Sequence, residues 1–282
     1  MAKIKVLADS TIDLPANYLR DYDIGIVPIN IQFGTDSYQE GINIDQTTFY
    51  QKVDELGMIP QTSQPSVGQF ADAYRTYAQQ GYDSILSIHV TSKLSGTYNS
   101  ALLATQEVEK EIRVVPYDSL AGSAGLGYMC VDAVEMARAG NSAEEIIARL
   151  DQKRPEVRIF LTLASTKYAQ MSGRISHLQG FIAALLNVKP IISLIDGMLL
   201  PSGRVRSRQA ALAQIIDLTK QAADGRRVKF AVIHGEAHAE AEQLLEQGKQ
   251  ALNYADSFID DIAISLAVHF GPGVIGTVIY PE

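Results

Sequence analysis

Short apolar runs alternate with amphipathic stretches through the first half of the chain, and this alternation is the strongest constraint on the fold. Runs at 4–8, 84–90 and 112–116 have the length and β-branched content of buried strands, while stretches at 67–79 and 98–110 have helical periodicity. This order is typical of βαβ units, which build a parallel sheet covered by helices on both faces. The sequence therefore predicts an α/β fold whose N-terminal part is a doubly wound, mainly parallel sheet.

Local signals indicate where some of these elements begin or break. Asp45 or Thr47 is suited to cap a helix that reaches Leu56, and Ser66 is suited to cap the stretch at 67–79. Pro28 has no N–H to give to a strand ladder, so the apolar run around it is expected to be an edge or irregular strand. The segment that follows, up to Asp45, is expected to be a polar connection.

The alternation of short strands and helices changes around Arg154-Pro155. An Asp196-Gly197 turn separates an apolar run at 190–195 from 198–200, which predicts a β-hairpin. Further strand and helix patterns continue to the C-terminus. We expect two domains, a doubly wound domain at 1–160 and a mixed α/β domain at 161–282.

Composition narrows the class of protein. The chain has 282 residues, of which 46% are hydrophobic and 20% charged, and its formal charge is −8. The composition is that of a globular protein, and the acidic balance argues against a general nucleic-acid binder. Cys130 is the single cysteine, and no run approaches the ~20 apolar residues of a membrane span. The sequence predicts a cytoplasmic protein without stable membrane insertion, and nothing in it indicates a metal or cofactor.

Two hydroxyl-rich loops precede predicted helices. One is "TSKLSGTYNSA", residues 91–101, which contains Ser95, and the other is "QTSQPS", residues 61–66, which contains Thr62. Both would lie at the carboxyl edge of a parallel sheet, where ligands bind in such folds. A phosphate, a carboxylate or the transition state of a serine hydrolase would suit a loop of this kind. The Walker and nucleophile-elbow spacings are absent from the Ser95 loop.

Other polar residues have a structural and a functional interpretation. His269 precedes a Gly-Pro-Gly turn that would fix its imidazole at the end of an element, and Gly173 would point Arg174 in a specific direction. The alternating Arg204 and Arg206 are suited to a solvated face or to docking of an acidic partner. The segment "HGEAH" at 234–238 does not have a zinc-binding spacing, so it is read as an ordinary turn.

The apolar stripe near residue 180 is more typical of core than of a ligand pocket. Its members fall on one face of a short predicted helix and are Phe181, Ile182, Leu185 and Leu186.

Two alternatives remain open from the residues alone. A hydrolase could use Ser95 as nucleophile and His269 as base, with Asp118 orienting the histidine. A sugar-phosphate or nucleotide binder would place a phosphate at the Ser95 loop, because doubly wound sheets often bind such ligands.

Taken together, several short stretches, spread in order over nearly the whole chain, resemble the DegV family of bacterial proteins. The stretches that carry the resemblance are Asp9-Ser10-Thr11 with Asp13-Leu14, Thr62-Ser63-Gln64-Pro65-Ser66, Leu94-Ser95-Gly96-Thr97-Tyr98, Asp118-Ser119, Gly173-Arg174-Ile175, Lys189-Pro190-Ile191 and His269-Phe270-Gly271-Pro272-Gly273.

The resemblance implies a two-domain α/β protein that binds one long-chain fatty acid, such as palmitate or oleate. The chain is similar to the fatty-acid-binding subunit of bacterial fatty acid kinase, which is not itself an enzyme. That subunit presents the acyl carboxylate to a separate ATP-dependent kinase subunit, and the acyl phosphate formed enters lipid metabolism or transport. The resemblance assigns carboxylate contacts to Thr62 and Ser95, with His269 and Arg174 nearby, and a cationic His269 or Arg174 would favour the anion.

Overall fold

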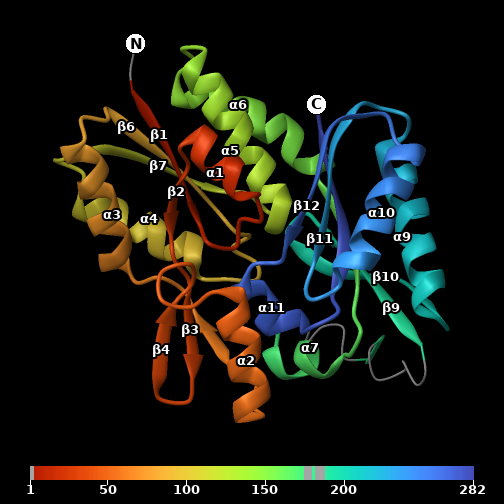
Figure 1. Ribbon diagram of the computed structural model, residues 1–282. Coiled ribbons are helices and arrows are strands. Elements are labelled where there is room, and N and C mark those ends of the chain that lie inside the picture. Colours follow the sequence, from red (N-terminus) through yellow and green to blue (C-terminus); the bar gives the residue numbers. More distant parts are fainter. Residues whose placement is uncertain (1–2, 175–179, 182–187) are drawn as a thin grey trace.

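The computed structural model describes residues 3–174, 180–181 and 188–282. Within these residues the strands form a four-stranded, a six-stranded and a three-stranded sheet, with helices packed around the two larger sheets (Figure 1). No helix among the described residues is long and apolar enough to cross a membrane.

The four-stranded sheet is parallel throughout, in the order β2-β1-β6-β7. Helices α3 and α4 pack on one face and α5 packs on the other, as a doubly wound sheet requires (Figure 1). The two cores follow the strand alternation, because Leu7 and Ile85 face α3 and α4 whereas Val6 and Leu86 face the other side. The prediction for this part is confirmed. The elements are β1 (Ile4–Asp9), α1 (Ala16–Tyr22), β2 (Gly25–Val27), α3 (Val67–Gln79), β6 (Ser84–His89), α4 (Thr97–Glu107) and β7 (Arg113–Asp118).

The six-stranded sheet is mixed, in the order β10-β9-β8-β13-β11-β12. Its neighbouring strands are antiparallel except for the parallel pair β11–β12, which confirms a mixed C-terminal architecture. Helices α9 and α10 cover one face (Figure 1). The division of the chain at residue 160 stays a prediction. The elements are β8 (Arg158–Thr162), β9 (Lys189–Ile195), β10 (Met198–Val205), α9 (Arg208–Ala223), β11 (Val228–His234), α10 (His238–Ala251), β12 (Tyr254–Asp261) and β13 (Ile275–Pro281).

Helix α5 (Ser123–Arg138) lies between the two larger sheets. Residues 123–134 are all buried, and the helix contacts β1 and β6 on one side and β11 and β13 on the other. One continuous apolar core therefore includes residues of both sheets, with Val6 and Val278 as examples. Helix α6 (Ala143–Lys153) and the short 3₁₀ helix η1 (Arg154–Glu156) then lead to β8.

A small antiparallel sheet stands beside the parallel one, in the order β4-β3-β5. It consists of β3 (Asn30–Phe33), β4 (Asp36–Gln39) and β5 (Gln61–Ser63), with α2 (Gln46–Leu56) between its last two strands. The expectation of one strand through Pro28 is wrong, because the chain leaves the first sheet there and enters this one. The predicted polar connection before Asp45 contains β4.

Several predicted caps and turns are confirmed. The Ser66 hydroxyl accepts from the Gln69 amide in a full capping box, and Asp45 accepts from Thr48 N at 2.8 Å. Asp196 and Gly197 have φ values of 48° and 74°, so they form the tight turn of the β9–β10 hairpin. The second hairpin strand is longer than predicted, since β10 continues to Val205.

Asp132 of α5 offers a test of the shared core. It accepts hydrogen bonds from Lys153 at 2.5 Å, Lys229 at 3.0 Å and the Tyr280 hydroxyl at 2.9 Å, and it is buried. We expect Asp132→Ala to lower the free energy of unfolding by about 3–5 kcal/mol, because two lysines would lose their buried partner. Urea denaturation at pH 7 measures this, with Asp72→Ala at an exposed position as a control that changes little.

The same interaction predicts a pH dependence. Burial acts to raise the pKa of Asp132, but Lys229 and Lys153 outweigh it and hold this pKa below its ordinary value of 3.8. The stabilisation is therefore complete above the ordinary value and is lost as the pH falls through the lowered pKa. An Asp132→Ala variant that unfolds at the wild-type urea concentration at pH 7 would contradict the stabilising role of Asp132.

Candidate functional site

The candidate site lies at the carboxyl edge of the parallel sheet, where the strand order reverses. β1 is flanked by β2 on one side and β6 on the other, so the chain leaves β1 and β6 toward opposite faces and opens a crevice between them. The hydroxyl-rich loop after β6 meets β5 there. A Cβ on Gly96 would lie 2.6 Å from the Gln64 side-chain nitrogen, so the missing side chain lets the two loops pack together.

A polar pocket opens at this edge. It brings together the four residues predicted as ligands, Thr62, Ser95, Arg174 and His269, which come from four separate segments. Their role in binding stays a prediction. The other lining residues are Thr11, Ile29, Ser63, Gln64, Val90, Leu94, Leu199, Ser265, Leu266 and Phe270.

An apolar cavity adjoins the polar pocket. The two share Val90, Leu94, Leu199, Leu266 and Phe270 as lining residues. The cavity lies over the face of the six-stranded sheet that is turned toward α5. Its further lining residues are Thr91, Ala121, Gly122, Ser123, Ile159, Leu161, Leu194, Ile233, Ile262, Val274, Gly276 and Val278.

His269 stands in the last turn of α11 (Ile264–Phe270), before Gly271, whose φ is 76°. Its Nε2 lies 3.3 Å from Thr62 Oγ1, whereas its buried Nδ1 has no hydrogen-bond partner among the described residues. Burial lowers the pKa of His269 to about 3, and the nearby Arg174 adds to this effect. The ring is therefore neutral at physiological pH in the protein without ligand. A cationic His269 beside a bound carboxylate stays a prediction.

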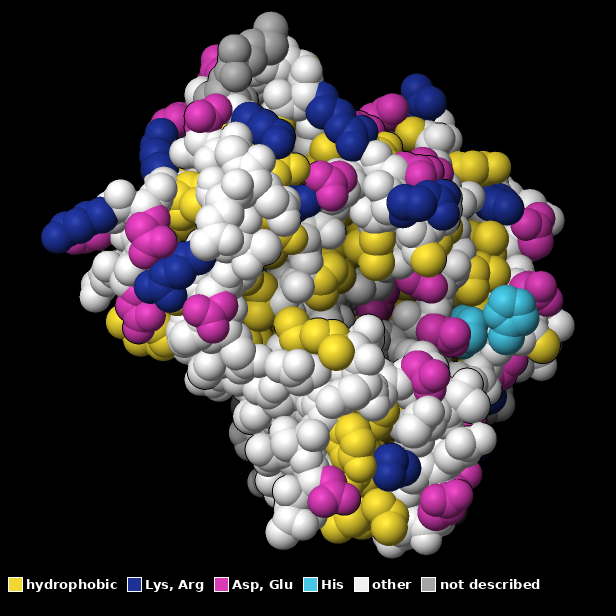
Figure 2. Space-filling view, turned by 60° about the vertical axis from the view of Figure 1, so that its left-hand side comes forward, with side chains coloured by type: hydrophobic (Ala, Val, Ile, Leu, Met, Phe, Trp, Pro, Cys, Tyr) yellow, Lys and Arg dark blue, Asp and Glu magenta, His cyan; other side chains and the backbone are white. Residues whose placement is uncertain are grey.

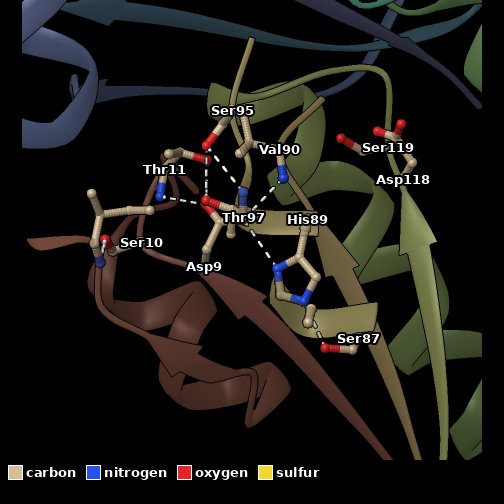
Figure 3. A network of polar contacts seen from close by, with 12 residues as sticks. Asp9, Ser10, Thr11, Ser87, His89, Val90, Ser95, Thr97, Asp118 and Ser119 are labelled. Atoms are coloured by element: carbon tan, nitrogen blue, oxygen red, sulfur yellow. Dashed lines mark hydrogen bonds and ion pairs between the residues drawn. The ribbon is translucent and has the colours of Figure 1, made fainter. Parts of the chain in front are cut away.

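Ser95 and Arg174 approach the pocket differently. The Ser95 hydroxyl lies 2.9 Å from Thr97 Oγ1 and accepts from Thr97 N at 3.3 Å at the start of α4 (Figure 3). Arg174 follows the end of α7 (Lys167–Ser172), where Gly173 has a φ of 74°, and it is exposed. Its guanidinium donates to the Ser172 carbonyl at 2.9 Å, which leaves further N–H groups for an anion.

The hydrolase arrangement does not form in this structure. His269 is paired with Thr62, and Ser95 is paired with Thr97. Asp118 accepts from the Ser92 hydroxyl at 2.5 Å, so it does not orient His269. A serine nucleophile needs a continuous series of hydrogen bonds from serine to histidine to carboxylate. Here each of the three groups has a different partner.

The remaining predicted residues lie elsewhere. His234 Nε2 and His238 Nδ1 are 3.2 Å apart, and the described part of the chain contains no group of three side chains suited to a metal. Arg204 and Arg206 are exposed on and just after β10. Phe181 packs against the main core, whereas Ile182, Leu185 and Leu186 of the predicted stripe lie outside the described residues.

Sequence reasoning missed Ser265 and the walls of the apolar cavity. Ser265 lines the polar pocket one turn before His269, on a helix that was not predicted. The cavity wall uses alternate residues of β13, such as Gly276 and Val278. Because β13 is buried on both faces, no alternation of polar and apolar residues could distinguish the cavity side.

The fold and site together define a class of two-sheet α/β protein in which an apolar cavity ends in a polar, hydroxyl-rich pocket. Comparison with known proteins identifies the family: residues 3–282 match the model of the DegV family, so the chain belongs to this family. A fatty acid-binding protein of Thermotoga maritima is 32% identical over 279 residues, covering 97% of this chain and 96% of that protein.

Solved structures agree with this assignment. A DegV family protein from Thermus thermophilus, described for its fatty acid binding, superposes with a TM-score of 0.92 at 32% identity, covering 99% of this chain and 100% of that one. A stearic acid-binding protein from Eubacterium ventriosum gives a TM-score of 0.90 at 29% identity, covering 100% and 98%.

The neutral state of His269 predicts a pH dependence of stability. Its folded pKa of about 3 lies below the ordinary 6.5, so the unfolded chain takes up the proton first as the pH falls. Between pH 7 and pH 5 this group should cost the wild type about 2 kcal/mol of folding free energy that His269→Asn does not lose. Urea denaturation at the two pH values measures the difference. The exposed His238→Asn is the control and should follow the wild type; equal losses in all three proteins would contradict the prediction.

Proposed function

We propose that this protein binds one long-chain fatty acid, with the acyl chain in the apolar cavity and the carboxylate in the polar pocket. The observation that carries the proposal is the junction of the two spaces. Five apolar side chains line both, so an amphipathic molecule with one polar end can occupy them together. The fatty acid-binding relatives of similar sequence and fold support the same ligand class.

The cavity supplies the affinity. A chain of roughly fourteen methylenes at ~0.8 kcal/mol each gains up to about 11 kcal/mol on leaving water. Losses of translational and conformational freedom reduce this gain. A sugar phosphate has no long apolar chain to fill such a cavity, which disfavours the phosphate-binding alternative.

The polar pocket sets the orientation of the ligand. A buried carboxylate needs hydrogen-bond donors, or it will be protonated or expelled. The hydroxyls of Thr62 and Ser95 and a neutral His269 supply donors, while Arg174 supplies positive charge. A carboxylate placed beside His269 would favour its protonated form, so binding would raise the low pKa of this ring.

We further propose that the bound carboxylate is presented to a separate kinase subunit, which forms the acyl phosphate for lipid metabolism. The polar pocket has an exposed Arg174 at its rim, where a second protein could reach the head group. Phosphoryl transfer depends on positioning and charge stabilisation, and the ATP and metal site would belong to the partner. In this scheme the chain itself needs no nucleophile.

Ligand binding can be tested on the purified protein. Native mass spectrometry should show one fatty acid per chain, and added palmitate or oleate should bind to protein stripped of lipid. Thr62→Val and Ser95→Ala should each weaken palmitate binding by about tenfold, as expected for one lost hydrogen bond to a charged group. Leu103→Ala, at an exposed position on α4, is the matched control and should bind normally. Failure of palmitate and oleate to bind, or a bound polar phosphate, would overturn the proposal.

Partner docking is a separate question, and the exposed Arg204 and Arg206 are the candidate residues. Replacing both by glutamate should lower acyl phosphate formation by the kinase with ATP but leave palmitate affinity unchanged, because charge complementarity at a rim mainly affects association. Arg20→Glu is a control at an exposed arginine on α1. Unchanged turnover in the double variant would remove these residues from the docking surface.

A further inference from the structure

A buried chain of polar side chains lies behind the polar pocket (Figure 3). Tyr74 Oη is 3.0 Å from Ser87 Oγ, which is 2.6 Å from His89 Nε2, and His89 Nδ1 is 3.1 Å from Asp9 Oδ2. All four residues have no exposed surface. Burying so many polar groups costs free energy unless their hydrogen bonds are satisfied, and a satisfied network makes the surrounding structure rigid. We therefore ask what this network holds in place.

The order serine, histidine, aspartate matches the hydrogen-bond order of a hydrolase triad, but the setting excludes that activity. Ser87 is fully buried on β6, one of the two inner strands of the parallel sheet. Its hydroxyl faces Tyr74 rather than an open space. A nucleophile must reach a substrate carbon. The network therefore acts through what it holds in place.

Asp9 is the end of this network that meets the pocket. Its Oδ1 accepts from Thr11 N at 3.0 Å and from Thr11 Oγ1 at 2.6 Å, and its Oδ2 accepts from Val90 N at 2.9 Å as well as from His89. Thr11 and Val90 both line the polar pocket, one from the loop after β1 and the other from the loop after β6. One carboxylate thus ties together the two sides of the crevice.

The Thr11 backbone extends the connection. Its carbonyl accepts from Ser123 N at 2.9 Å, at the start of α5, and Ser123 lines the apolar cavity. The position of Thr11 therefore affects both spaces. The Thr11 hydroxyl and the Val90 amide donate their hydrogen bonds to Asp9, so they are not donors for a ligand. The head group must therefore be bound by the other residues of the pocket.

We propose that Asp9, held by His89, is a positioning residue that sets the walls of the carboxylate pocket at the reversal point of the sheet. This inference rests on the proposed binding of a fatty acid carboxylate in that pocket. Asp9 does not touch the ligand. Its effect is transmitted through Thr11 and Val90, and the buried His89 provides the partner that keeps the carboxylate group in one orientation.

The ionisation of Asp9 is consistent with this arrangement. Burial acts to raise the pKa of Asp9, but its bonds with His89, Thr11 and Val90 outweigh burial and hold this pKa below the ordinary value. An ionised carboxylate has acceptor oxygens only, so it can satisfy donors on both sides of the crevice. An asparagine has one oxygen and one NH₂ group, so it must lose the bonds on one side.

The test compares palmitate with the straight-chain alcohol of the same length, which fills the apolar cavity but has no carboxylate. Wild-type protein should prefer palmitate. Asp9→Asn should reduce the ratio of the two affinities by about tenfold, with little change for the alcohol. Asp132→Asn removes a buried carboxylate far from the pocket, so it is a matched control that lowers stability but keeps the ratio. All measurements are made well below the unfolding temperature of each variant.

The outcomes separate the two hypotheses. If wild-type protein binds neither palmitate nor the alcohol, the proposed function fails and this inference fails with it. If wild-type protein prefers palmitate and Asp9→Asn keeps that preference, or loses affinity for both ligands equally, only the positioning role is overturned. His89→Asn keeps a donor near Asp9, so it should reduce the ratio less than Asp9→Asn. It decides the question if Asp9→Asn does not fold, and a ratio equal to that of wild type would then refute the role.

Discussion

The burial of α5 between two sheets is the constraint on which the remaining structure depends. A helix that is buried around its whole circumference over 123–134 must be covered on every side, and a single sheet covers only one. The second sheet supplies the other cover, and Asp132 fixes it through Lys229 and Tyr280. The first turn of the same helix borders the apolar cavity at Ser123. The helix that joins the two sheets therefore also forms part of the wall of the apolar cavity.

Helix α11 couples the two halves at the head-group end. Asp13 accepts from Ala263 N at 2.7 Å and Glu40 accepts from Ser265 N at 3.1 Å, so two residues of the N-terminal half hold the start of a helix more than two hundred residues away. Burial raises the pKa of Glu40 to about 7 and that of Asp13 well above its usual range. These two bonds fix the direction in which α11 presents His269 to the pocket, and so the geometry of the site depends on contacts outside it.

Much of the fold could be predicted because local chemistry determines it. Ser66 specifies a helix start and Asp196-Gly197 specifies a tight turn, whatever the rest of the chain does. The four pocket residues could be selected from loop chemistry and family resemblance. Three features could not be predicted: the small sheet around β4, the short helix α11 and the walls of the apolar cavity. Tertiary contacts determine them, and no periodic pattern in the sequence marks them. The neutral state of His269 was equally hidden, since it results from burial by residues distant in the sequence.

The charges around the polar pocket determine how much negative charge a bound anion can carry. Arg174 is the one cation among the described residues that line it, and the other donors are neutral hydroxyls and an imidazole. Two acidic groups lie behind the walls, but Asp9 is compensated by His89 and three other donors, and the raised pKa of Glu40 reduces its charge. Such a site can neutralise about one negative charge, whereas a phosphate dianion would need a further cation or a row of backbone amides. A monoanionic carboxylate at the end of an apolar chain satisfies both the charge of the pocket and the shape of the cavity beside it.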